Sequence, residues 1–166
     1  MRMIDALLME FDREASTTRK LLERCPDAKL GWQPHPKSMT LGKLANHLVS
    51  IPRLVASSLH KDGLDLASVA RPPAAETAGA IVASFNEACT AAKAAMAGVD
   101  DAKAMGTFSL SQGATTLTTL PRIAFLRSIL LNHSVHHRGQ LSVCLRLLDV
   151  PVPSIYGPSA DENPFG

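Results

Sequence analysis

Residues 126–148 read LRSILLNHSVHHRGQLSVCLRLL, and this stretch decides the fold. Its apolar residues recur at steps of three and four, which places them on one face of an α-helix. Two histidines, His133 and His137, occupy positions of that apolar stripe. The stripe consists of Leu126, Leu130, His133, His137, Leu141, Cys144 and Leu148. The pattern therefore predicts a long helix that turns two imidazoles toward the protein interior.

Three earlier segments show the same helical period. They cover about residues 4–25, a stretch from Ser38 or Thr40 to His60, and residues 75–97. The last helix, which contains residues 126–148, is expected to begin near Thr118 or Thr119. Hydrophobic residues make up 46% of the 166 residues but aromatic residues only 4%, so we expect an aliphatic core of the kind that packed helices form. The sequence predicts one all-α domain over residues 1–166, built as a four-helix bundle.

The segments between these helices are less regular. Residues 62–75 contain glycine and proline and predict a linker. Residues 100–119 predict an irregular loop or a short hairpin, since they alternate only weakly. Residues 150–166 carry four prolines and predict an extended C-terminal tail. Tyr156 and Asp161 in this tail are candidates to fold over the histidine site.

Charge and cysteine content exclude several classes of function. The formal net charge is only +2, without a basic cluster, so we expect no nucleic-acid partner. No apolar run reaches the ~18 residues that a membrane span requires, and we expect no signal peptide. Cys25, Cys89 and Cys144 are odd in number and widely spaced. They predict buried free thiols in a reducing cytoplasm.

His133 and His137 have the spacing of metal ligands. Side chains four residues apart lie one above the other on a helix and can converge on one ion at about 2.0–2.1 Å. The residue after His133 is serine, which excludes a zinc peptidase with the HExxH motif. Core or surface histidines are the alternative interpretation. His136 lies off the stripe, beside the site or at the bundle edge.

A third histidine, His47, is the candidate to complete the site. It lies beside Leu44, Leu48 and Ile51 on the apolar face of its helix, five residues before Pro52. A histidine that only fills the core would have the same pattern. As a ligand, His47 would give three nitrogen donors and leave one coordination position open, the arrangement of a catalytic metal site.

Two blocks of sequence resemble those of DinB-like proteins, the DNA-damage-inducible family. They are NHSVHHRGQL at residues 132–141 and WQPHPKSMTLGKLANH at residues 32–47. The resemblance implies an up-down-down-up bundle with a long crossover, commonly dimeric. It also implies a divalent metal ion, zinc or nickel, held by His47, His133 and His137.

The resemblance also suggests a chemistry. Related proteins include S-transferases that use bacillithiol or mycothiol, and a mycothiol-dependent maleylpyruvate isomerase. We therefore expect a metal-dependent enzyme, a thiol S-transferase or hydrolase that acts on a small electrophilic substrate. The alternative is a stress-response bundle without catalysis, in which the metal stabilises the fold or a homodimer. Arg138 and Gln140 either contact ligands or brace the helix.

Overall fold

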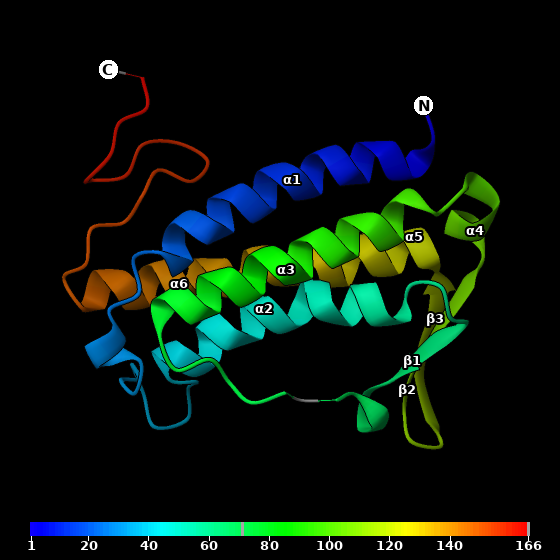
Figure 1. Cartoon of the computed structure of the whole chain (residues 1–166), viewed down its shortest axis with the longest axis horizontal. Helices are drawn as coiled ribbons and strands as arrows, with labels where there is room; N and C mark the ends of the chain where they lie inside the picture. The colour runs from blue at the N-terminus through cyan, green and yellow to red at the C-terminus, as the bar shows by residue number, and fades with distance from the viewer. Residues whose placement is uncertain (71, 166) are drawn as a thin grey trace.

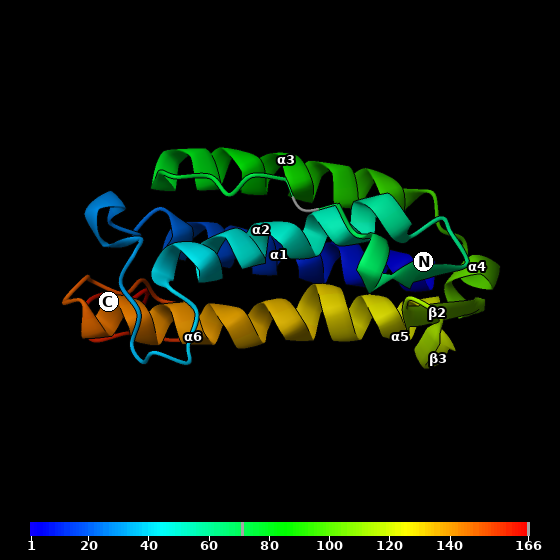
Figure 2. The ribbon, with the colours of Figure 1, turned by 90° about the horizontal axis from the view of Figure 1, so that it is seen from below.

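The computed structural model describes residues 1–70 and 72–165. Position 71 of the predicted linker and position 166 of the predicted tail lie outside the described residues. Four long helical units form the body of the molecule (Figure 1). They are α1 (Met3–Leu22), α2 (Leu41–Ser58), α3 (Ala78–Ala97) and a last unit made of α5 (Arg122–Phe125), η3 (Leu126–His133) and α6 (Ser134–Leu147). Along the chain they run up, down, down and up (Figures 1 and 2).

The prediction of an all-α bundle is wrong, because one end of the molecule holds a three-stranded mixed sheet. Its strands are β1 (Gly63–Asp65), β2 (Thr107–Gln112) and β3 (Thr115–Pro121), in the order β1-β2-β3. β1 pairs with β2 in parallel, and β2 pairs with β3 in antiparallel orientation. The short helix α4 (Asp101–Met105) lies between α3 and β2. Of the two alternatives predicted for residues 100–119, the short hairpin is confirmed by the antiparallel pair of β2 and β3.

Short elements complete the connections. The 3₁₀ turns η1 (Asp27–Lys29) and η2 (Leu66–Ser68) follow α1 and β1. At Gly63 a Cβ atom would lie only 2.4 Å from the Ser109 carbonyl oxygen. The close approach of β1 and β2 therefore requires glycine at this position. The crossover that follows returns along α2, where the side-chain amide of Asn46 bonds both the N–H and the carbonyl of Ala75.

Local sequence signals explain where the helices begin. Thr40 and Thr77 precede α2 and α3, and their hydroxyls accept hydrogen bonds from the N–H groups of Lys43 and Ala80. Both threonines satisfy donors that the first helical turn leaves free. The predicted start of the last helix at Thr118 or Thr119 is wrong. Those residues belong to β3, and the helix begins after Pro121.

The core is aliphatic, as the composition predicts, and it continues from the helices under the sheet, where Phe108 stacks on Phe125. Trp32 packs against it from the loop before α2. Cys25, Cys89 and Cys144 are free and buried, which confirms their prediction. Burial raises the pKa of the Cys25 and Cys89 thiols to about 12. Across the described residues, no helix combines the length with the apolarity that a membrane span requires.

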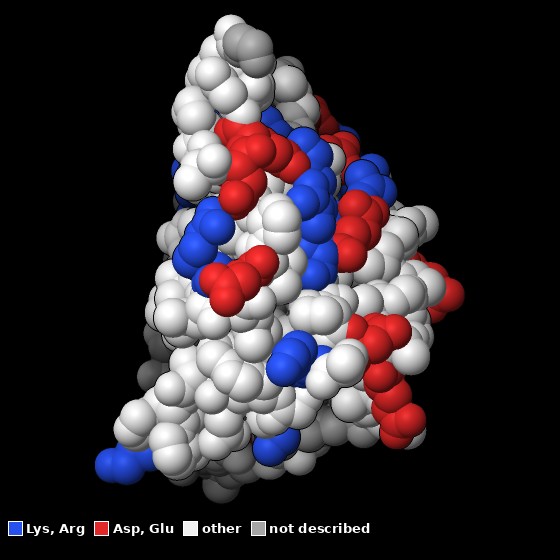
Figure 3. Space-filling model, turned by 90° about the vertical axis from the view of Figure 1, so that its left-hand side faces the viewer, with Lys and Arg blue, Asp and Glu red and all other residues white. Residues whose placement is uncertain are grey.

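The C-terminal tail is folded onto one end of the bundle by ion pairs and hydrogen bonds. Glu162 pairs with Arg24 in the turn after α1, and Asp161 pairs with Arg146 of α6. Figure 3 shows this end of the molecule, with Lys and Arg side chains interspersed among Asp and Glu in the upper part of the view. The lower part of the same view carries few charged side chains.

Candidate metal centre

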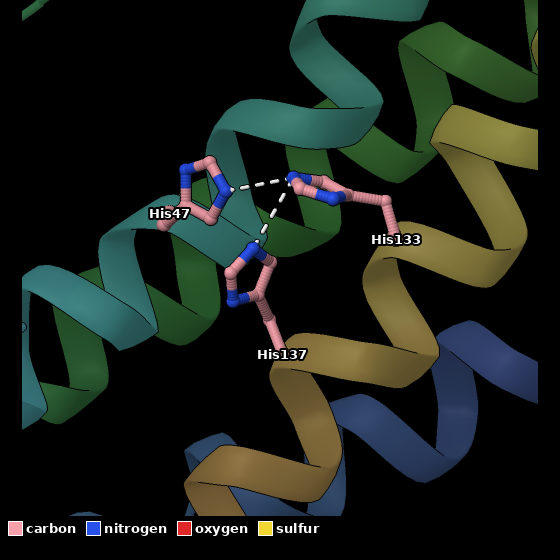
Figure 4. Close-up of side chains that lie close together, drawn as sticks. All are labelled: His47, His133 and His137. Atoms are coloured by element: carbon pink, nitrogen blue, oxygen red, sulfur yellow. Dashed lines mark hydrogen bonds between the residues drawn. The ribbon is translucent and has the colours of Figure 1, made fainter.

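The three histidines singled out in the sequence meet between α2 and the last helical unit. His47 comes from the middle of α2, His133 ends η3, and His137 lies in the first turn of α6. Their imidazole rings point toward one another (Figure 4). The Nε2 atom of His133 is 3.0 Å from Nε2 of His47 and 3.2 Å from Nε2 of His137. Residues 86 positions apart in the sequence thus form one cluster.

The π-helical segment η3 determines where His133 lies. Its eight residues, Leu126–His133, separate α5 from α6 in an otherwise continuous helix. A π-helix bonds residue i to i+5, and such segments are common at functional sites. Leu126 and Leu130 remain on the buried face within this segment, so the apolar stripe continues to His133. The sequence pattern gave no sign of the π geometry.

The spacing of the three nitrogen atoms fits a metal ion. Tetrahedral zinc with bonds of about 2.0–2.1 Å sets neighbouring nitrogen ligands ~3.3 Å apart. The two closest Nε2 pairs, at 3.0 and 3.2 Å, are near that value. Among the described residues, His47, His133 and His137 form a group of His, Cys, Asp or Glu side chains that could hold a metal ion.

The outer nitrogens of two rings are already engaged. Nδ1 of His137 lies 2.7 Å from Oε1 of Gln140, an oxygen that can only accept, so this Nδ1 carries the proton. The Ser50 hydroxyl donates to the His47 carbonyl and lies 3.3 Å from Nδ1 of His47. This leaves Nδ1 of His47 as the donor to the hydroxyl oxygen. Both rings then turn an unprotonated Nε2 toward the centre.

This arrangement needs a positive charge at its centre. A neutral His133 has at most one proton on Nε2 and can donate it to only one of its two neighbours. One of the two short contacts therefore joins lone pairs unless a cation lies between the rings. A proton suits this role poorly, because desolvation, with the neighbouring histidines, lowers the pKa of His47 to about 4. Desolvation also lowers the pKa of His133 and that of His137.

Other residues singled out in the sequence lie apart from the cluster or beside it. The His136 ring packs edge-on against His137, with 4.9 Å between centroids, so it flanks the site. His35 and His60 bond Lys37 and Lys103 respectively. Asp161 bonds the Val152 N–H and pairs with Arg146. The prediction that Asp161 folds over the histidines is therefore not supported by its contacts.

Of the two roles predicted for Arg138, its contacts show the bracing one. It follows His137 but points to the opposite side of α6, where only 2% of it is exposed. Nη1 of Arg138 pairs with Oε2 of Glu14 at 2.6 Å, and Nη2 donates to the Tyr156 hydroxyl at 2.6 Å. Tyr156 in turn donates to Glu14 at 2.8 Å. Arg138 thus braces α1 and the tail, and Tyr156 belongs to this brace.

An open pocket adjoins the histidines. It has a volume of about 630 Å³ and lies between the loop before α2, the first turns of α2 and the middle of α6. Leu44 and Gln140 line it, and each lies three residues from a histidine of the cluster. His47 and His133 are half-buried and His137 is 8% exposed, so the cluster is accessible at the edge of the bundle.

Comparison with known proteins identifies the family. The sequence model of the DinB superfamily matches residues 10–141. This chain belongs to the DinB superfamily. The uncharacterised protein YrdA of Bacillus subtilis (strain 168) is 29% identical over 168 residues, which cover 96% of this chain and 91% of YrdA.

Two crystal structures share the DinB fold of this chain. A DinB-like protein from Bacillus cereus ATCC 10987 has a TM-score of 0.73 at 24% identity, covering 92% of this chain and 97% of the other. A DinB-like protein of Bacillus subtilis, YjoA, has a TM-score of 0.73 at 16% identity, with coverage of 90% and 97%. The resemblance inferred from the two histidine-containing blocks is thereby confirmed at the level of the family.

Proposed function

We propose that His47, His133 and His137 bind one divalent metal ion, zinc or nickel, and that the protein is a metal-dependent enzyme. The observation that carries the proposal is the convergence of three Nε2 atoms without a complementary group between them. Three protein ligands leave a coordination position for a small molecule, which is the arrangement of catalytic rather than structural zinc sites.

The proposed reaction is the transfer of a thiol, or of water, to a small electrophilic substrate. A bound divalent ion lowers the pKa of a thiol or water and so supplies an anionic nucleophile at neutral pH. Gln140 and Ser50 hold the outer nitrogens of two ligands and fix their tautomers. The adjoining pocket gives the substrate a place within reach of the site. The three free thiols suit the cytoplasm, where a small-molecule thiol cosubstrate is available.

A second candidate function is structural, because the three histidines come from two different helical units. Because His47 comes from α2 and the other two histidines from the last helical unit, a bound ion also cross-links the bundle. A protein that uses its metal only for stability would lose thermal stability on metal removal and show no turnover. We therefore propose to measure the melting temperature and the activity on a panel of thiols and electrophiles, each before and after chelation.

The first test is the metal content of protein purified without a nickel column. We expect one equivalent of a divalent ion, with X-ray absorption showing three nitrogen donors and at least one non-protein ligand. His133→Ala should remove both the metal and any turnover, whereas His35→Ala, a matched change outside the cluster, should remove neither. A His133→Ala protein that keeps its full metal content would refute the triad.

A further inference from the structure

The pocket beside the histidines has a composition that selects among substrates. Its apolar lining comes from Pro34, Met39, Leu44, Val143 and Cys144. Lys37, Ser38 and Gln140 add polar groups, and Lys37 is the charged residue of the lining. Gly139 belongs to the wall as well, and a Cβ built on it would meet no atom within 4 Å. The α6 backbone is therefore open to an occupant at this point.

Two of the three polar residues that line the pocket, Lys37 and Gln140, offer it hydrogen-bond donors. The Lys37 backbone N–H donates to Nδ1 of His35, and the Ser38 N–H donates to the His35 carbonyl. These bonds hold the loop that carries the Lys37 ammonium. Gln140 accepts from His137 through Oε1, so its amide N–H₂ group is the part left to face an occupant. An ammonium and an amide N–H₂ together match the oxygens of an anion.

From this lining we infer that the pocket binds the substrate of the metal site, and that the substrate is a small carboxylate with an apolar body. Its carboxylate would bond the Lys37 ammonium and the Gln140 amide. Its apolar part would contact Met39, Leu44 and Val143. The inference rests on the proposed function, because it places the reactive end of the bound carboxylate at the histidines. These lie one helical turn from Leu44 and Gln140 of the pocket.

Gln140 gains a second role from this geometry. Its oxygen fixes the tautomer of His137, and its nitrogen would contact the substrate, so one side chain connects the pocket to the metal ligand. Gln140→Glu separates the two roles. A glutamate keeps an oxygen acceptor for His137 Nδ1, but it replaces the donor to the substrate with a negative charge that repels a carboxylate.

The test measures binding of two probes of equal shape, 4-phenylbutanoate and 4-phenylbutanamide, to metal-free protein freed of chelator. Binding is followed by the methyl NMR signals of Met39, Leu44 and Val143. We expect the carboxylate to bind about tenfold more tightly than the amide, as a charge-assisted hydrogen bond provides. Lys37→Met and Gln140→Glu should each reduce this preference to about twofold or less, since each removes a charge-assisted donor. The matched control Lys29→Met, outside the lining, should leave it unchanged.

Three outcomes would overturn the inference. The two probes could bind equally to the unmodified protein, or Lys37→Met could leave the preference intact. Alternatively, the same methyl signals could shift with protein concentration alone, which would show that a second copy of the chain covers the pocket. Zinc uptake by the same proteins is measured separately. If the unmodified protein binds no zinc but keeps its preference for the carboxylate probe, the proposed function is refuted and the carboxylate pocket is not.

Discussion

Two clusters of three polar side chains begin at neighbouring residues of α6, and they differ in how their members satisfy one another. His137 points toward α2 and meets His47 and His133, whereas Arg138 points toward α1 and meets Glu14 and Tyr156. In the Arg138 cluster a cation, an anion and a hydroxyl are complementary. In the histidine cluster three rings of the same kind face one another, and a cation would be complementary to them.

The difference separates a structural cluster from a functional one. Glu14 and Arg138 are 8% and 2% exposed, and each finds its partners within the protein. Removing one partner of such a buried pair strongly destabilises the folded protein, since the other charge is then left without compensation. The histidines are instead positioned at the expense of favourable contacts with one another, which is typical of a functional site.

The largest effect on stability is expected from Glu14→Gln. Removing the carboxylate leaves the Arg138 guanidinium buried without a counter-charge, which should lower the free energy of unfolding by about 3–5 kcal/mol. Urea denaturation of the two proteins measures this change. The control is Glu10→Gln, which removes the exposed pair with Arg127 and should cost about 0–1 kcal/mol. Similar costs for both variants would show that the Glu14–Arg138 pair is not the buried brace described above.

Gln140→Leu tests whether support from outside the triad matters to the histidine cluster. The leucine cannot accept from Nδ1 of His137, so the ring loses its fixed tautomer and orientation. Zinc affinity should fall about 10- to 100-fold, as is usual when such a partner is removed, with little change in the unfolding free energy of the metal-free protein. Competition with a fluorescent zinc chelator measures the affinity. An unchanged affinity would contradict the role assigned to Gln140 here.

Tyr156→Phe removes only the hydroxyl of the structural cluster. Its ring is 65% exposed, but the hydroxyl accepts from Arg138 and donates to Glu14. The cost should be about 1.5–3 kcal/mol, the usual range for a hydrogen bond to a charged group. A double-mutant cycle with Glu14→Gln measures the coupling. If the two costs add without coupling, the hydroxyl does not belong to the brace.

The smallest effect is a pH dependence that distinguishes the clusters. Burial, together with the neighbouring histidines, lowers the pKa of His47 in the folded chain to about 4, below its ordinary value of 6.5. The unfolded chain therefore binds protons more readily between these values. The stability of the metal-free protein should be complete above pH 6.5 and decline as the pH falls toward 4.

Melting temperatures between pH 7 and pH 4.5 measure this decline. Carboxylates with a lowered pKa, such as Asp161, add to the decline only near the lower end of this range, where the unfolded chain begins to bind their protons. His47→Gln should flatten the profile, because it removes a group that the folded state keeps neutral. Tyr156→Phe should leave its slope unchanged. A profile that is equally steep in the His47→Gln protein would assign the pH dependence to other groups.

Sequence reasoning found the features that are encoded locally. The spacing of His133 and His137, the start of α2 near Thr40, and the buried cysteines all follow from the helical period and from neighbouring residues. His47 required the resemblance to a family, because a single histidine on an apolar face has the same pattern whether it fills the core or binds an ion.

The sheet and the burial of Arg138 depend on contacts between distant parts of the chain. β1 has three residues and pairs with β2 more than forty positions later, too short a strand to show a period. Most of β3 is exposed on both faces, so its threonines give no alternating apolar signal. The bracing role of Arg138 was one of two predicted, but its burial was not evident, because α6 is buried on two sides and a single stripe describes only one of them.

The π-helical segment has a consequence for comparing relatives of this protein. In an α-helix each residue advances the direction of its side chain by about 100°. Deleting one residue between Leu126 and Asn132 would therefore rotate His133 and His137 together, away from His47, while leaving their spacing intact. Chain length in this segment becomes a marker of the site in its own right. A homologue with both histidines but one residue fewer after its Pro121 counterpart would keep the motif and lose the cluster.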